Sequence, residues 1–229
     1  PEHEKPKDRS RFHDEMDRLP HFRPPAILLP HGTVGNSASG IAPDVSKGKF
    51  GPFREQLFVA DQTHSVINRC FLEKVNGYYQ GACFPFVKGF GSGNVPVVQA
   101  SDGSLFSGGT DRGWGARGGK RYALDRVVWT GKTPFEILEM RIKKDGFELE
   151  FTKPVDKKTA ESLESYEMKT HTYIFQGKYG SPRVDASTPS IKTAKLAKDG
   201  KTVRLVIEGM QRGHVHELKS GGVRSKEEN

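Results

Sequence analysis

A glycine-rich segment over residues 108–119 (GGTDRGWGARGG) carries the side chains that most suggest a binding site. It places Trp114 between Arg112 and Arg117. An exposed indole can stack on a sugar ring, and guanidinium groups can hold hydroxyl or carboxylate oxygens. Neither the glycine spacing nor a following helix fits a phosphate-binding loop or a dinucleotide fingerprint. The three side chains are therefore the candidate substrate- or cofactor-binding residues, and the alternative is that Trp114 only fills a core.

His64 is the candidate catalytic residue. It follows a predicted strand that ends near Asp61, and an imidazole held in a pocket can act as a general base. The alternative is a surface histidine without a catalytic role. His214 and His216 are two residues apart on another predicted strand and so project from one face. Two ligands do not make a metal site, and no metal site is predicted.

The elements around these residues begin with a predicted β-hairpin. Residues 66–75 and 78–87 are two extended runs that flank the dipeptide Asn76-Gly77. This dipeptide is typical of a two-residue type I′ turn. Opposed residue numbers then add up to 153, which fixes the register of the hairpin.

The register places Cys70 opposite Cys83 in a pair that is not hydrogen-bonded. The Cα atoms of such a pair are close enough for a disulfide. Two buried thiols are the alternative, because a bulge at Gly81 would shift the register by one residue. A disulfide would place the protein outside the cytoplasm.

Composition favours a β protein without a nucleic-acid partner. Glycine (26) and proline (14) indicate many turns, and the hydrophobic fraction is 34%. The net charge of +8 is spread thinly along the chain, whereas nucleic-acid binders usually concentrate lysine and arginine on one face. No apolar run approaches the ~18 residues of a membrane helix, so no membrane span is expected. Because residue 1 is proline and no signal peptide precedes it, we expect a piece of a longer protein.

The chain divides into three predicted parts. Residues 1–25 alternate charge sign and are expected to form a linker or a surface wrap. Residues 26–139 contain two series of short strands with tight turns, a repetition typical of β-propeller blades. Residues 140–229 contain strands that alternate apolar and polar side chains, as in a small Ig-like sandwich. The predicted fold class is all-β, a partial β-propeller of about two four-stranded blades followed by an Ig-like β-sandwich.

Several runs carry a family resemblance. Residues 102–115 (DGSLFSGGTDRGWG) and 124–135 (LDRVVWTGKTPF), with the hairpin and residues 51–61, resemble the last blades of bacterial propellers related to soluble glucose/sorbosone dehydrogenases. Residues 146–156 (GFELEFTKPVD), followed by Tyr166, Gly213 and His216, resemble the bacterial Ig-like module often appended to them. Together the matches cover about residues 26–220.

The resemblance implies a periplasmic or secreted bacterial protein whose complete propeller binds pyrroloquinoline quinone and calcium. Members of the family use a histidine base and arginines that hold the quinone carboxylates. His64, Arg112, Trp114 and Arg117 are the residues available here for such roles, but they are not aligned with the family's catalytic positions. The chain contains no Cys-x-x-Cys-His haem motif.

Two functions follow as expectations. The first is part of an extracytoplasmic quinone-dependent sugar or alcohol dehydrogenase-like protein. The second is a non-catalytic scaffold module that binds carbohydrate or a partner. Open blade edges would expose unpaired strands, so the remaining blades or another polypeptide are expected as partners.

Overall fold

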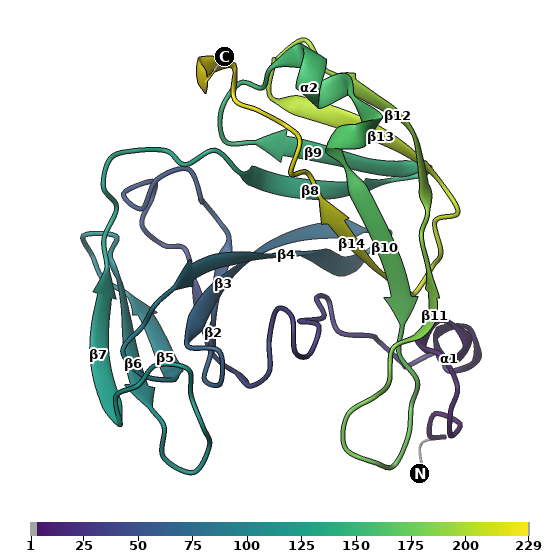
Figure 1. Cartoon of the computed structure of the whole chain (residues 1–229). Helices are drawn as coiled ribbons and strands as arrows, with labels where there is room; N and C mark the ends of the chain where they lie inside the picture. Colours follow the sequence, from purple (N-terminus) through teal and green to yellow (C-terminus); the bar gives the residue numbers. More distant parts are fainter. Residues whose placement is uncertain (1–3, 229) are drawn as a thin grey trace. The chain divides into compact units, whose positions relative to one another are not determined.

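The computed structural model describes residues 4–228 and is all-β, with several antiparallel sheets and only short helices (Figure 1). Contacts divide the chain into two units. Unit 1 comprises Pro1–Pro25 and Ile142–Asn229, and unit 2 comprises Ala26–Arg141. Within residues 4–228, no helix has the length and apolar character needed to cross a membrane.

The first sheet of unit 2 is a four-stranded antiparallel meander in the order of the sequence. Its strands are β1 (Ala38–Pro43), β2 (Leu57–Asp61), β3 (Val66–Val75) and β4 (Tyr78–Lys88). The β3–β4 hairpin has the predicted register, with Val75 opposite Tyr78 at the turn. Asn76 and Gly77 have φ values of 49° and 86°, as a type I′ turn requires.

The hairpin bulge lies away from the turn. The register shifts between Ile67 and Asn68 and stays regular at Gly81, which faces Leu72. A Cβ atom at Gly81 would lie 1.9 Å from the Phe71 carbonyl oxygen, so the close approach of the strands requires glycine there. The register predicted from the turn is therefore confirmed as far as the cysteine pair.

A second, three-stranded antiparallel meander completes unit 2. Its strands are β5 (Asn94–Gln99), β6 (Leu105–Thr110) and β7 (Tyr122–Val127), in that order. β5 packs against β1, where a side chain at Gly40 would collide with the carbonyl oxygen of Val95. Figure 1 shows the three strands as a small teal sheet with β7 at its edge.

Both sheets of unit 2 contribute to one hydrophobic core. Its buried members are Ala42, Phe50, Phe53, Phe58, Ala60, Ile67, Phe90, Val97 and Leu105. The guanidinium of Arg69 lies at the margin of this core with no exposed surface. It donates to Gln56 Oε1 and to the carbonyl oxygens of Ile137 and Leu138, and it lies over the Phe84 ring at 4.4 Å. A buried charge is tolerated here because hydrogen bonds and aromatic faces replace its hydration.

Unit 1 is built mainly from two further antiparallel sheets. One has the order β11-β10-β14, from Val184–Ser187, Glu167–Thr172 and Val215–Lys219. The other has the order β12-β13-β9-β8, from Ser190–Leu196, Thr202–Glu208, Gly146–Phe151 and Ile137–Lys143, and β8 runs across the division between the units. Alternating residues of β9 and β13 are buried, as the sequence pattern predicts; they include Phe147, Leu149, Val203 and Leu205.

Short helices connect these strands. Asp156 caps α2 (Lys157–Glu161) by accepting a hydrogen bond from the Thr159 amide. The 3₁₀ helix η1 (Leu163–Ser165) follows, and the Tyr166 hydroxyl then donates to the Ala160 carbonyl oxygen at 2.7 Å. A second 3₁₀ helix, η2, covers Lys226–Glu228.

The N-terminal stretch, expected as a linker or surface wrap, contains the helix α1 (Phe12–Arg18). The Arg9 amide donates to the Phe175 carbonyl oxygen, and Arg11 forms a two-point ion pair with Asp185 of β11. The Phe12 ring packs on Phe175 with ring centroids 4.8 Å apart. Figure 1 shows α1 beside β11, so this stretch is an integral part of unit 1.

Candidate functional site

The Trp114 indole is fixed to the turn between β2 and β3. Its Nε1 donates to Thr63 Oγ1 at 2.8 Å, and the Thr63 hydroxyl donates to Ser37 Oγ at 3.1 Å. The residue nevertheless keeps 57% of its surface exposed. The purely structural reading of Trp114 as a core plug is therefore wrong, because a plug would be buried. A hydrogen-bonded, exposed indole is a rigid platform for an apolar ring face.

The turn that holds the platform is itself organised by Asp61. This buried carboxylate ends β2 and accepts hydrogen bonds from the backbone amides of Asn36, Ser37 and His64 at 2.6–2.8 Å. Three amide donors replace water around the charge, so the carboxylate is satisfied without a cation. The position of Thr63, and through it that of Trp114, follows from this turn.

Residues 111–121, called here the Trp114 loop, dock on the turn through the backbone. The Gln62 side-chain amide donates to the carbonyl oxygens of Thr110 and Trp114 at 3.0 and 2.7 Å. The Arg117 amide donates to the Thr63 carbonyl oxygen at 3.0 Å, and the Gly118 amide donates to Ser65 Oγ at 2.8 Å. These bonds hold the loop at its start and in its middle.

Gly93 makes this close docking possible. A Cβ atom there would lie 2.4 Å from the Gln62 carbonyl oxygen and 2.7 Å from that of Thr110. Both neighbours are backbone atoms, which cannot rotate away as the end of a side chain can. Glycine at this position is therefore a steric requirement of the loop's position.

Three buried polar side chains lie in the turn before β3 and at the start of β5. Gln62 Oε1, Ser92 Oγ and both amide atoms of Asn94 are buried, and none has a hydrogen-bond partner within residues 4–228. Ser92 lies under the loop, because its backbone nitrogen would be 2.6 Å from a Cβ atom at Gly118. The loop therefore covers the backbone of Ser92 and the side-chain amide of Gln62.

Four cations of the Trp114 loop are exposed. Arg112, Arg117, Lys120 and Arg121 take part in no salt bridge with an acid of the described chain. Three other arginines of unit 2 do pair, Arg69 with Glu136, Arg126 with Asp102, and Arg141 with Glu139, whereas Arg54 forms no salt bridge within residues 4–228. The loop therefore combines a fixed aromatic platform with unneutralised positive charge.

His64 lies in the same turn, but its surroundings are those of a structural residue. It is 9% exposed, and its backbone amide is bonded to Asp61. In the described part of the chain, its imidazole forms no hydrogen bond or ion pair with Arg112 or Arg117. The turn and the docked loop bring the backbones of His64, Arg112 and Arg117 into one region. Their side chains do not form a hydrogen-bonded group of a histidine base and arginines.

The histidines of unit 1 form a separate group. The His13 and His214 rings stack with centroids 5.8 Å apart, and His216 packs edge-on against Phe147. Burial lowers the pKa of His171 and of His216, and the Arg183 charge lowers that of His171 further. Across residues 4–228, no group of three or more His, Cys, Asp or Glu side chains is placed to hold a metal ion.

The two cysteines are cross-strand neighbours, as the turn predicted. Both are thiols in the structure, and the disulfide remains a prediction that the register permits. Cys70 is buried, and burial together with the nearby Cys83 raises its pKa to about 12. The Cys83 thiol lies 3.6 Å from the Leu28 carbonyl oxygen.

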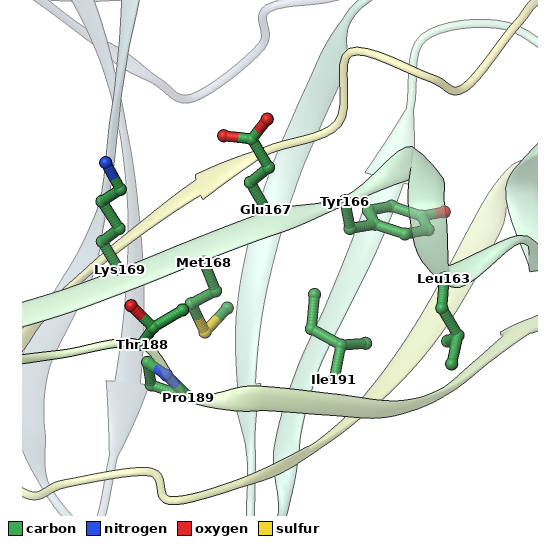
Figure 2. A pocket seen from close by; sticks show the side chains of 8 residues that line it. All are labelled: Leu163, Tyr166, Glu167, Met168, Lys169, Thr188, Pro189 and Ile191. Carbon is green, nitrogen blue, oxygen red and sulfur yellow. The ribbon is translucent and has the colours of Figure 1, made fainter.

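Unit 1 carries a shallow groove of about 310 Å³ that contains none of the predicted site residues. Figure 2 shows Met168 on one side of β10, with Glu167 and Lys169 directed to the other. The Tyr166 hydroxyl at one end is already bonded to Ala160. The lining consists of Leu163, Tyr166, Glu167, Met168, Lys169, Thr188, Pro189 and Ile191.

Sequence reasoning missed the residues that fix the platform and part of its charge. Gln62 and Thr63 hold the Trp114 loop, and Lys120 and Arg121 extend the charge of Arg112 and Arg117. The adjacent Lys-Arg pair was visible next to the glycine-rich segment. Nothing local in the sequence links Thr63 to Trp114, which are 51 residues apart.

No family model, curated protein or solved structure matches this chain.

Proposed function

We propose that unit 2 is a carbohydrate-binding module and that Trp114 is its stacking platform. The observation that carries the proposal is the hydrogen bond from the Trp114 indole to Thr63, which fixes an otherwise exposed ring. An aromatic ring held in place in advance loses little conformational freedom when a ligand stacks on it. Sugar rings present the C–H face that such a platform accepts, and their hydroxyls can accept hydrogen bonds from arginine.

The fold we propose for this module is two successive propeller blades, of which the second has three strands instead of the predicted four, followed in unit 1 by an Ig-like sandwich. The two meanders of unit 2 follow each other in sequence, and their first strands, β1 and β5, pack together. That arrangement is how consecutive propeller blades meet around a central axis. The two antiparallel sheets of unit 1 suit a small sandwich.

The alternative is a quinone-dependent dehydrogenase, which rests on the sequence resemblance. The described residues do not fit a quinone site as they stand, because His64, the candidate base, is buried with 9% of its surface exposed. We derive no step through the quinone. A dye-reduction assay on a sugar panel, with added pyrroloquinoline quinone and calcium, tests this alternative directly, and turnover that is lost in His64→Gln would favour it.

Isothermal titration calorimetry of the full chain against an oligosaccharide panel tests the binding proposal. Trp114→Ala should weaken binding about tenfold or more, because it removes the stacking face. The matched control is Tyr179→Ala in unit 1, which removes an aromatic side chain that is 93% exposed. Equal losses in the two variants, or no binding by the parent chain, would contradict the proposal.

A further inference from the structure

The unneutralised charge of the Trp114 loop indicates which kind of carbohydrate it binds. Residues 111–121 carry four cations and a single acid, Asp111. Elsewhere in unit 2, three arginines have carboxylate partners within 4 Å. The loop cations lack such partners in the described chain, and all four residues are exposed. Their hydrogen-bonding capacity is therefore available to a ligand anion.

We propose that the Trp114 loop recognises an acidic glycan, one whose sugar rings bear carboxylate or sulfate groups. This inference rests on the proposed carbohydrate-binding function and narrows it to a substrate class. The indole supplies a flat apolar contact that does not depend on ligand charge. Arginine supplies paired N–H donors whose geometry matches carboxylate and other oxyanions. An acidic glycan satisfies both requirements with one ligand.

The places of the three residues in the loop are consistent with simultaneous contact to one ligand. Arg112 is two residues before Trp114 and Arg117 is three residues after it, so the two cations lie on either side of the platform in the chain. Hydrogen bonds to Thr63 hold both the Trp114 indole and the Arg117 backbone. The Trp114 indole and the Arg117 backbone are thus bonded to the same residue, which limits how far the Arg117 side chain can lie from the platform.

A basic protein binds polyanions through general electrostatic attraction, and this has to be distinguished from recognition of sugar. General attraction and sugar recognition depend on different features of the protein. General attraction depends on net charge wherever it lies, whereas acidic-glycan recognition needs Trp114 together with the charges beside it. Variants that remove equal charge at the loop and at a remote surface separate the two.

The experiment measures affinity of the full chain for matched short oligomers. Oligogalacturonate is compared with its methyl ester, and a sulfated galactan oligomer with its desulfated form, so that each pair differs mainly in charge. Polyglutamate serves as an acidic ligand without sugar. We expect the acidic member of each pair, or of one pair, to bind at least about fivefold more tightly than the neutral member, with the advantage shrinking as salt rises.

The variants assign this preference to the loop. Arg112→Gln with Arg117→Gln should weaken binding of the acidic member more than that of the neutral member, so that the preference for the acidic member falls below about twofold. Lys178→Gln with Lys195→Gln removes the same charge from exposed positions of unit 1 and should leave the preference in place. Trp114→Ala should weaken binding of both members.

Each of the other possible outcomes contradicts either the acidic-glycan proposal or the carbohydrate-binding function. Equal binding of the acidic and neutral members, abolished by Trp114→Ala, would overturn the acidic-glycan proposal and leave the carbohydrate-binding function intact. Binding of polyglutamate as tight as that of the acidic oligomers, or equal losses in the loop and remote double variants, would show charge attraction alone. Absence of binding to every oligomer would overturn the carbohydrate-binding function itself.

Discussion

Cys70 and Cys83 lie directly opposite each other across the β3–β4 hairpin. Counted from the closing pair Val75 and Tyr78, they occupy a non-hydrogen-bonded position, where cross-strand side chains approach most closely. A disulfide is sterically compatible with such a position.

We therefore predict that mild oxidation joins the two cysteines within one chain. Diamide, which accepts two protons and two electrons, should give a monomer lighter by two hydrogen atoms in intact-mass measurements. In the native reduced protein, alkylation should modify Cys83 before Cys70, because the raised pKa of the buried Cys70 keeps it a protonated, unreactive thiol at neutral pH. Faster alkylation of Cys70 would contradict this order.

Replacement of Arg69 should strongly destabilise unit 2. Arg69→Met keeps much of the volume but removes the donors to Gln56, Ile137 and Leu138, which leaves Gln56 Oε1 and the Ile137 carbonyl oxygen without this partner, while Leu138 keeps the Gln56 amide. The expected loss is about 3–5 kcal/mol in the free energy of unfolding, measured by chemical denaturation. Arg126→Ala, which breaks an exposed pair with Asp102, should have a much smaller effect, because solvent screens the pair. Similar losses of unfolding free energy in the two variants would show that the buried hydrogen bonds of Arg69 stabilise unit 2 no more than an exposed ion pair does.

Unit 1 should lose stability in mild acid. Burial lowers the folded-state pKa of His171 and His216 below the ordinary value of 6.5. The unfolded chain then binds more protons, so the stabilisation is fully present above pH 6.5 and is lost as the pH falls through the folded-state pKa values. The Glu217 carboxylate beside His171 opposes this effect, and the charges of Arg183 and His214 reinforce it.

Hydrogen exchange of the β10 and β14 amides between pH 5 and pH 7.5, corrected for the intrinsic pH dependence of exchange, measures this change. His171→Gln with His216→Gln should flatten the profile relative to the parent chain. A profile unchanged by the double variant would show that other groups set the acid sensitivity.

The outer face of the second meander should drive self-association. Tyr122 and Leu124 of the edge strand β7 are each 76% exposed, and Val98 of β5 lies on the same sheet with 57% exposed. Exposed apolar faces and open edges favour association. Sedimentation velocity should show concentration-dependent oligomers that Leu124→Lys with Tyr122→Lys suppresses. Val45→Lys, at another exposed position of unit 2, is the control, and a parent chain that stays monomeric at all concentrations would count against the prediction.

Gly93→Ala should displace the Trp114 loop. The added methyl group would collide with the carbonyl oxygens of Gln62 and Thr110, so the loop must move and the Trp114 indole loses its fixed position. We expect stronger acrylamide quenching of tryptophan fluorescence and weaker glycan binding. Gly115→Ala is the matched control, since its Cβ atom would meet open space in the same loop. Equal quenching in the two variants would contradict the steric argument.

Local turn chemistry explains why parts of the fold could be predicted from the sequence. Asn76-Gly77 sets the hairpin register, and the alternation in residues 146–151 marks β9. β1 (ASGIAP) was not predicted, because its glycine and proline are unfavourable in strands and its pairing with β2 supplies the stability. The helix α1 was missed because it is short and Arg11 provides no side-chain cap.

The candidate site could be predicted only in its exposed part. Arg112, Trp114 and Arg117 share one short segment, so residue type alone identified them. Their supports come from Gln62, Thr63 and Gly93, which contact the loop only after the two meanders have packed together. Tertiary contacts of this kind leave no periodic or local pattern in a single sequence.

The pairing of Arg9 with Phe175 has a consequence for the order in which the chain matures on the ribosome. Residues near the start emerge first, yet their partners in β10, β11 and the segments around them are synthesised only after all of unit 2. During that interval unit 2 has its whole sequence available and can fold by itself. The aromatic side chains of Phe12 and Phe22 remain exposed to solvent until Phe175 has been synthesised. Early capture of these rings by a chaperone would shield them until their docking surface is made.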